Sequence, residues 1–236
     1  MMARGATLLA FPNEAQSARG QLVTALRRHR LPELLIEDLV QLANAWPGYE
    51  PAEALACALA GRMKLDAIDL EKARGILLVG PQGSGKSAVA EKILRAAKLA
   101  GRITYQTGAV EGLALFRSAS HRPDTLTVME AEGFNPLNAR ATSAFSALGG
   151  IAGVDTIGVV SAMSDAEDAA DIVAALKLKR VIVTGLDRTK RLGATVAAIT
   201  SGARLAHVTH GARPDDALET LEPGALAEML LADPAQ

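Results

Sequence analysis

The sequence predicts an α/β fold, in which a domain built on a mainly parallel sheet with helices on both faces follows a small helical domain. Three observations support this. Short continuous apolar runs recur from residue 75 onward, as expected of parallel strands buried on both faces. Stretches with helical periodicity separate these runs, which is the pattern of parallel strands joined by crossover helices. Residues 17–70 carry helical periodicity alone.

The N-terminal part divides into two regions. Residues 1–16 (MMARGATLLAFPNEAQ) contain one Arg and an apolar patch that is too short for a secretory signal. We expect a flexible arm there, with the alternative role of a docking peptide. Residues 17–72 are expected to form three short amphipathic helices that pack as a small bundle, with Gly, Asn and Pro in the turns. Residues 73–236 are expected to form the α/β domain.

The α/β domain can be predicted element by element. The apolar runs GILLVG, RITY, TLTVME, TIGVVS, RVIVTG and RLAHVT are the expected strands. The expected helices lie between and after them, at 86–100, 110–118, 139–148, 165–176, 190–200 and 214–231. Ligands of such sheets bind outside the carboxyl ends of the strands, so functional residues are expected in the loops at that edge.

The composition narrows the class of partner. A formal net charge of −1 and an aromatic content of 3% argue against direct binding of nucleic acid, which uses basic patches and stacking platforms. No apolar run approaches the ~20 residues of a membrane span. Cys57, the single cysteine, forms no disulfide within the chain and is expected to be buried in its helix. These features fit a reducing, cytoplasmic compartment.

A basic run occupies Arg27, Arg28, His29 and Arg30. It is expected to be a solvated helix face, with contact to anionic lipid or an acidic partner as the alternative. None of the four histidines has the spacing from carboxylates or cysteine that a metal site requires; they are His29, His121, His207 and His210.

A phosphate-binding loop is the most specific motif of the chain. Gly80-Pro-Gln-Gly-Ser-Gly-Lys-Ser fits G-x-x-x-x-G-K-[ST] and lies between an expected strand and an expected helix, the context that the motif requires. Backbone N–H groups of the loop and of the helix start bind phosphates. Lys86 is expected to reach the β- and γ-phosphates, and the Ser87 hydroxyl to bind Mg²⁺. The residues predicted to hold the nucleotide here are Gly80, Gln82, Gly83, Ser84, Gly85, Lys86 and Ser87.

A second motif points to the base. Thr184-Gly185-Leu186-Asp187 follows a strand and resembles the guanine-reading T-K-L-D element of GTPases. A carboxylate at Asp187 accepts hydrogen bonds from the guanine N1–H and 2-amino groups, a donor pair that adenine lacks. Gly185 replaces a Lys whose alkyl arm would pack over the base, so guanine affinity is expected to fall while selectivity remains. We therefore expect GTP or GDP with Mg²⁺, and Thr184 and Asp187 at the base.

Residues 75–231 resemble the SRP-type GTPases: the signal-recognition-particle GTPase, its receptor and the flagellar-placement GTPase. TGAVEGL is similar to the family's A-A-V-E-Q-L. The text after Asp187 is similar to D-x-T-x-x-x-G followed by S-G-x-P-I-x-x-x-x-x-G, with matches at Thr189, Lys190, Gly193, Ser201, Gly202 and Gly211. The resemblance implies a helical N domain before a P-loop NTPase G domain, and it places Gly211 at the nucleotide.

The elements that serve hydrolysis in this family are altered. Where the family has D-T-x-R, this chain has Ile103 in place of Asp and Gln106 in place of Arg, and EAEGFNP at 130–136 stands for D-T-A-G-R-N-P. Each lost catalytic group can cost roughly 10²–10⁴-fold in rate. Glu130 is expected to hold Mg²⁺ together with Ser87, although it is one methylene longer than Asp. Glu130 and Glu132 are the candidate catalytic residues, and an exposed loop carboxylate is the simpler interpretation of Glu132.

These expectations combine into an SRP-like GTP-binding protein that acts as a nucleotide-dependent switch in protein targeting or flagellar placement, with slow hydrolysis. The resemblance implies a GTP-dependent protein partner or a homodimer across the nucleotide face, which Lys190 and Arg191 would help to form. It also implies a cytoplasmic location, with peripheral contact at the inner membrane. Two alternatives stay open: a pseudo-GTPase interaction module that binds nucleotide without turnover, and an ATP-dependent enzyme such as a small kinase, which Asp187 disfavours.

Overall fold

The computed structural model describes residues 17–117, 122, 124–133, 151–211 and 213–232. The predicted arm at 1–16, the predicted helix at 139–148, His121 and the 134–136 part of the EAEGFNP motif lie outside the described residues. Among the described residues, no helix combines the length and the apolarity needed to cross a bilayer.

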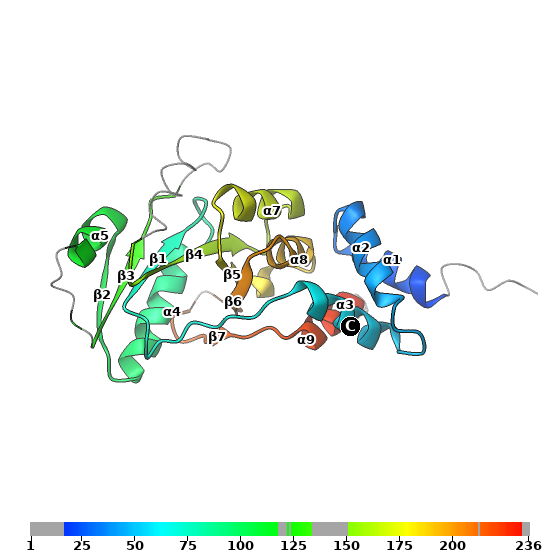
Figure 1. The fold of residues 1–236 in the computed structure, drawn as a ribbon, viewed down its shortest axis with the longest axis horizontal. Coiled ribbons are helices and arrows are strands. Elements are labelled where there is room, and N and C mark those ends of the chain that lie inside the picture. The colour runs from blue at the N-terminus through cyan, green and yellow to red at the C-terminus, as the bar shows by residue number, and fades with distance from the viewer. Residues whose placement is uncertain (1–16, 118–121, 123, 134–150, 212, 233–236) are drawn as a thin grey trace, which may run out of the picture.

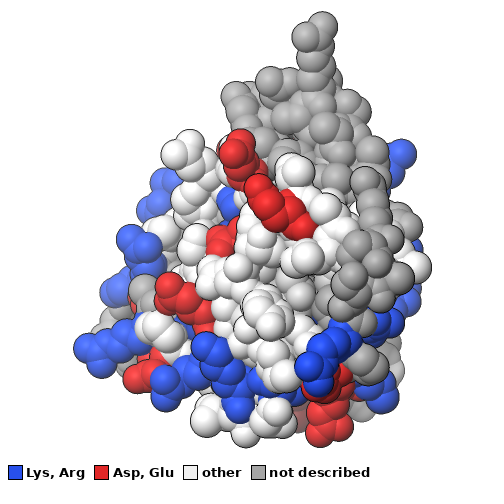
Figure 2. Space-filling view, turned by 90° about the vertical axis from the view of Figure 1, so that its left-hand side faces the viewer, with Lys and Arg blue, Asp and Glu red and all other residues white. Residues whose placement is uncertain are grey.

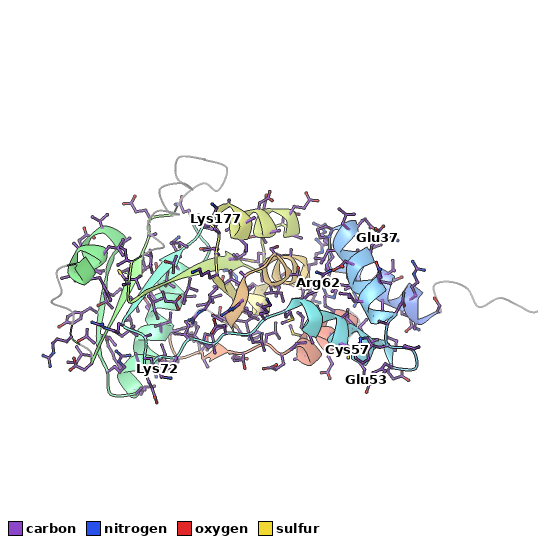
Figure 3. The ribbon with its side chains drawn as sticks, in the orientation of Figure 1. Glu37, Glu53, Cys57, Arg62, Lys72 and Lys177 are labelled. Carbon is purple, nitrogen blue, oxygen red and sulfur yellow. The ribbon has the colours of Figure 1, made fainter. Side chains whose placement is uncertain are left out.

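Three short helices precede the sheet, as predicted: α1 (Ala18–Arg28), α2 (Glu33–Ala43) and α3 (Pro51–Arg62). The Ser17 hydroxyl caps α1 by accepting a hydrogen bond from the Gly20 N–H at 3.1 Å. Arg62 at the end of α3 pairs with Asp38 of α2, and Figure 3 labels Arg62 beside these helices. Cys57 lies on α3 but is only partly buried, so the expectation of a buried thiol was wrong.

A seven-stranded sheet follows, in the order β2-β3-β1-β4-β5-β6-β7 (Figure 1). All neighbouring strands run parallel except β6 and β7, which are antiparallel, so the predicted mainly parallel sheet is confirmed. The strands are β1 (Gly75–Val79), β2 (Ile103–Gly108), β3 (Thr125–Glu130), β4 (Val154–Ser161), β5 (Arg180–Thr184), β6 (Arg204–Thr209) and β7 (Leu218–Glu219).

Helices cover both faces of the sheet (Figure 1). On one face, α4 (Lys86–Leu99) packs through Val89 and Ile93 against inward-facing strand residues such as Ile76. On the other face lie α5 (Ala109–Arg117), α7 (Ala166–Ala175) and α8 (Gly193–Thr200). Alternate residues of each buried strand point to opposite faces, which explains why these strands read as continuous apolar runs.

The C-terminal helix α9 (Pro223–Leu231) leaves the sheet and packs on the N-terminal helices. Leu226 and Leu230 of α9 are fully buried in one core cluster with Leu55 and Leu59 of α3, and the same cluster continues to α7, α8 and the sheet. The N-terminal helices therefore share a core with the α/β part, and the domain boundary after residue 72 stays a prediction.

The connection from α3 to β1 is held along the edge of β6. The Asp66 N–H donates to the Leu205 carbonyl at 2.9 Å. The Asp66 carboxylate pairs with Arg180 at 3.1 Å and with Arg204 at 3.2 Å. These contacts lie at the amino ends of β5 and β6, so they stabilise the edge of the sheet that is opposite to the predicted ligand edge.

Two predicted helices are shorter than the sequence suggested. The helix predicted at 190–200 begins only at Gly193, because the Thr189 hydroxyl accepts a hydrogen bond from the Arg191 N–H at 3.0 Å and holds a turn there. The helix predicted at 214–231 is a loop, the strand β7 and then α9. Pro223 opens α9, and the preceding Glu222 is extended, as expected of a residue before proline.

The basic run at the end of α1 is not simply a solvated face. The His29 ring is buried, its Nδ1 accepts from the Leu192 N–H at 3.2 Å, and its Nε2–H donates to the Leu230 carbonyl at 3.0 Å. The Gly193 N–H donates to the His29 carbonyl at 3.0 Å, and a Cβ on Gly193 would lie 2.5 Å from that oxygen. His29 therefore joins α1 to α9 and to the start of α8, while Arg27 pairs with Glu33 at the surface.

Burial lowers the pKa of His29 and the pKa of His207 below the ordinary value of 6.5. Because the unfolded chain takes up these protons more readily, each neutral ring contributes stability that is present above about pH 6.5 and is lost as the pH falls. We expect the free energy of unfolding in urea to fall between about pH 7.5 and pH 5.5. His29→Gln should make that fall smaller. Equal pH dependence in wild type and His29→Gln would contradict this.

Candidate functional site

The phosphate loop joins β1 to α4 at the carboxyl edge of the sheet. Gly85 is the N-cap of α4, has φ 93° in the left-handed region and is followed by no side-chain cap, so the first N–H groups of α4 point outward from the helix start. A Cβ on Gly80 would lie 2.4 Å from the Val159 carbonyl oxygen, which places the loop directly on β4. The predicted strand–loop–helix arrangement is confirmed.

Lys86 lies folded against its own loop. Its Nζ donates to the Gly80 carbonyl at 3.0 Å and to the Pro81 carbonyl at 2.9 Å. Burial lowers the pKa of Lys86, and the nearby Glu130 carboxylate raises it in part. The ammonium group is thus held at the mouth of the loop by weak neutral acceptors that an anionic group can replace.

The hydroxyl of Thr184 binds the backbone of the phosphate loop. Thr184 is buried at the end of β5, and its Oγ1 donates to the Ser84 carbonyl at 2.7 Å. Its side chain also lies 3.2 Å from where a Cβ on Gly85 would be. Its contact with the phosphate loop is therefore observed, and its predicted contact with the base stays a prediction. The Ser84 hydroxyl is buried and has no hydrogen-bond partner among the described residues. An incoming acceptor would satisfy this hydroxyl.

Ser87, Glu130 and Gln106 meet at the ends of α4, β3 and β2. The Ser87 hydroxyl donates to Glu130 Oε2 at 2.7 Å, and Gln106 Nε2 donates to Glu130 Oε1 at 2.7 Å. The two residues predicted to hold a metal ion are therefore in direct contact. The role of Gln106 as the second support of Glu130 was missed from the sequence, although the strand register places both residues near the ends of paired strands.

Ile103 does not lie where the sequence comparison implied. β2 pairs Ile103 with Thr125 and Gly108 with Glu130, so Ile103 is at the opposite end of the strand, about 16 Å along it from the site. An exposed Ile103 therefore does not occupy a place beside the phosphates. The reason is that β2 continues to Gly108, whereas the strand expected from the sequence, RITY, ended at Tyr105.

The segment after β3 closes onto the phosphate loop. A Cβ on Gly133 would lie 2.7 Å from the Cα of Gln82, so these two backbones touch. Ala131 between Glu130 and Glu132 is buried, and its N–H donates to the Leu78 carbonyl at 3.0 Å. Glu132 is exposed, and its candidate catalytic role stays a prediction.

The predicted base-reading residue makes one defined contact. Asp187 lies in the 3₁₀ turn η2 (Leu186–Arg188), and its Oδ1 accepts a hydrogen bond from the Gly211 N–H at 2.8 Å. The Gly185 N–H donates to Thr209 Oγ1 at 3.3 Å. The β5 and β6 loops are thus joined at the same edge of the sheet, and Asp187 and Gly211, predicted separately, are neighbours.

The side-chain donors of the candidate metal site are oxygen atoms. The Ser87 hydroxyl and the Glu130 carboxylate are hard donors of the kind that Mg²⁺ uses. In the described part of the chain, no group of three or more His, Cys, Asp or Glu is arranged to hold a metal ion. Mg²⁺ is commonly bound by one or two protein ligands together with substrate phosphates, so this donor pair fits Mg²⁺ alongside a nucleotide.

Exposed apolar side chains gather at the outer end of the sheet. Ile103 and Tyr105 of β2 and Val110 and Leu115 of α5 are all exposed. Figure 2 looks onto this end, and the middle of the described surface there is largely uncharged, with charged residues around it. Since Gly108 pairs with Glu130, the end of this surface at the start of α5 lies next to the candidate site.

Solved structures with this architecture identify the fold. FlhF complexed with GTP and Mg²⁺ has a TM-score of 0.72 at 18% identity, covering 92% of this chain and 100% of that chain. FtsY from Thermotoga maritima has a TM-score of 0.68 at 17% identity, covering 91% of this chain and 88% of that chain. The signal recognition particle receptor FtsY from Elizabethkingia anophelis has 0.67 at 15%, covering 91% and 86%.

This chain has the fold of FlhF and FtsY. The resemblance read from the sequence is confirmed at the level of the fold, including the helices before the sheet. No protein-family model and no curated protein matches the sequence.

Thr184→Val tests the support of the phosphate loop. The substitution keeps the side-chain shape and leaves the Ser84 carbonyl without its donor, so we expect the free energy of unfolding to fall by about 1–3 kcal/mol. The matched control is Thr200→Val, whose hydroxyl bonds only to the Val196 and Ala197 carbonyls within and next to its own helix turn. Urea unfolding of both variants checks this, and an equal effect of the two substitutions would rule out a special role for Thr184.

Proposed function

We propose that this protein is a divergent SRP-type GTP-binding protein, a nucleotide-dependent switch in protein targeting or flagellar placement that hydrolyses GTP slowly. The observation that carries the proposal is the joint placement of three elements at one edge of the sheet. These are the phosphate loop, the contact between Ser87 and Glu130, and the contact between Asp187 and Gly211. The fold shared with an FlhF chain complexed with GTP and Mg²⁺ supports the same assignment.

The phosphates are assigned to the loop and to the start of α4. The first N–H groups of α4 and the helix dipole attract anionic oxygens. Lys86 is close enough to turn from the Gly80 and Pro81 carbonyls to the β- and γ-phosphates. The unpartnered Ser84 hydroxyl lies in the same loop and would gain an acceptor from a phosphate oxygen.

Mg²⁺ is assigned to Ser87 and Glu130. When bound, the ion neutralises charge that develops on the β- and γ-phosphate oxygens. Gln106 fixes the Glu130 carboxylate from the other side, so the longer Glu side chain is held at one position. The three side chains come from three different elements, and their contact orders the end of β3 against the phosphate loop.

The same contacts favour slow hydrolysis. Gln106 brings an uncharged amide to Glu130, so it adds no positive charge near the transferring phosphoryl group. Glu132 is exposed and is the remaining candidate for orienting water. A pseudo-GTPase that binds nucleotide without turnover is the second candidate function, and it is favoured by the neutral amide that Gln106 places on Glu130.

A protein partner is assigned to the nucleotide face. Lys190 and Arg191 are exposed before α8, in the loop that follows Asp187. The apolar surface of β2 and α5 adjoins the site at the other side, and exposed apolar patches of this kind mark interaction surfaces. We infer a GTP-dependent partner or a homodimer across this face. A cytoplasmic location with peripheral contact at the inner membrane belongs to the same proposal.

Asp187→Asn tests the guanine assignment. An Asn amide donates where the carboxylate accepts, so it suits the 2-carbonyl of xanthine and opposes the 2-amino group of guanine. We expect GDP affinity, measured by calorimetry with Mg²⁺, to fall roughly 10- to 100-fold and XDP affinity to rise. Asp165→Asn, at the N-cap of α7, is the matched control. Unchanged GDP affinity in Asp187→Asn would overturn the guanine assignment.

Single-turnover hydrolysis separates the two candidate functions. With GTP, Mg²⁺ and excess protein, slow but measurable GDP formation is expected for wild type. Glu130→Gln should reduce that rate by roughly 10- to 1,000-fold if Glu130 holds the ion. No hydrolysis in wild type, with binding intact, would favour the pseudo-GTPase. Fast hydrolysis by the wild-type chain without a partner would contradict both candidate functions.

A further inference from the structure

Lys92 is a buried lysine in the middle of α4, outside every motif discussed above. The residue is 3% exposed, and a lysine is almost never buried to this extent without partners. It is six residues after Lys86 on the same helix, but it points toward the loop that follows β6 rather than toward the phosphate loop. Its role in the site needs a separate explanation.

The ammonium group of Lys92 contacts the loop that follows β6. Its Nζ donates to the carbonyl oxygens of Arg213 and Asp216, the second at 2.9 Å, and lies 3.8 Å from Asp216 Oδ2. The loop after β6, of which residues 211 and 213–216 are described, is here called the β6 loop. Two hydrogen bonds and one longer ion-pair contact therefore join the ammonium group to one short loop.

Asp216 connects the Lys92 contacts to Gly211. Its Oδ2 accepts from the Arg213 N–H at 3.0 Å and lies 2.3 Å from where a Cβ on Gly211 would be, so the carboxylate packs directly against that glycine. The Gly211 N–H in turn donates to Asp187 Oδ1 at 2.8 Å. A continuous set of contacts therefore runs from Lys92 through Asp216 and Gly211 to Asp187.

Arg95 offers an internal comparison on the same helix. It pairs with Asp215 of the β6 loop at 2.6 Å, but both side chains are at least half exposed. Exposed ion pairs contribute little, because water screens them and the side chains lose entropy. A buried ammonium group that donates to two backbone carbonyls fixes the loop much more firmly.

We propose that Lys92 is the positioning residue for the base-reading side of the site. It anchors the β6 loop to the helix that begins at the phosphate loop, so that Gly211 holds the Asp187 carboxylate in place to read guanine. This inference rests on the proposed function for its ligand, but the anchor itself is a property of the nucleotide-free protein. It adds a specificity-determining residue that the phosphate and base motifs do not contain.

The experiment compares Lys92→Met, which keeps the length of the side chain without its charge, with Arg95→Met. The first readout is hydrogen exchange of the nucleotide-free protein. Amides of 213–219 should exchange faster in Lys92→Met than in wild type, and Arg95→Met should resemble wild type. The second readout is calorimetric affinity with Mg²⁺. Lys92→Met should bind GDP roughly 10- to 100-fold more weakly, with ADP affinity unchanged, so the GDP/ADP ratio falls.

The two readouts separate the two proposals. If wild type does not bind GDP selectively, the proposed function fails, while faster exchange in Lys92→Met still establishes the anchor. If exchange and the GDP/ADP ratio of Lys92→Met both match those of Arg95→Met, Lys92 does not position the loop and the inference is overturned. Equal loss of GDP and ADP affinity would also overturn it, because that result indicates damage to the phosphate side.

Asp216→Ala keeps the proposal testable if Lys92→Met does not fold. It leaves Lys92 its carbonyl acceptors and removes the carboxylate that packs on Gly211. It should lower the ratio of GDP affinity to ADP affinity by a smaller factor than Lys92→Met does. Lys92→Arg, which keeps the positive charge, should retain part of the wild-type ratio. An unchanged ratio in Asp216→Ala would contradict the path from Lys92 to Asp187.

Discussion

The parallel arrangement of the sheet is the constraint on which the candidate site depends. Because β1, β3, β5 and β6 run in the same direction, their carboxyl ends meet at one edge, and each ends in a residue or loop of the site. β1 leads to the phosphate loop, β3 to Glu130, β5 to Thr184 and Asp187, and β6 to Gly211. The hydrogen bond from Thr184 to the Ser84 carbonyl then ties two of these strand ends together.

Much of this architecture could be predicted because it depends on short local sequence patterns. Apolar runs predicted the main strands, and the glycine spacing predicted the phosphate loop. Four consecutive residues ending at Asp187 predicted a guanine-reading element, whose role stays a prediction. β7 was missed because two residues give no periodicity, and it exists only through its pairing with β6. The late start of α8 was missed because it depends on the side chain of Thr189 and on the docking of His29, which no local pattern records.

The contacts between distant elements were the least predictable part. Gln106 was interpreted as a lost arginine, but its position is decided by strand register, and the register brings it to Glu130. Ile103 was misplaced for the same reason, because the expected strand ended at Tyr105 whereas β2 continues to Gly108. Lys92 carried no motif at all, and only its burial and the carbonyl groups around it distinguish it from the other lysines of the chain. A residue that donates hydrogen bonds to backbone carbonyl groups of a distant loop cannot be found from a short sequence motif.

The central claim is that this edge of the sheet binds a guanine nucleotide with Mg²⁺. Calorimetric titration of the wild-type chain with GDP, GTP and ATP, each with and without Mg²⁺, tests it most directly. The account predicts saturable binding of GDP and GTP at one site, strengthened by Mg²⁺ for GTP, and much weaker binding of ATP. Equal binding of ATP and GTP, or no binding of any nucleotide, would contradict it.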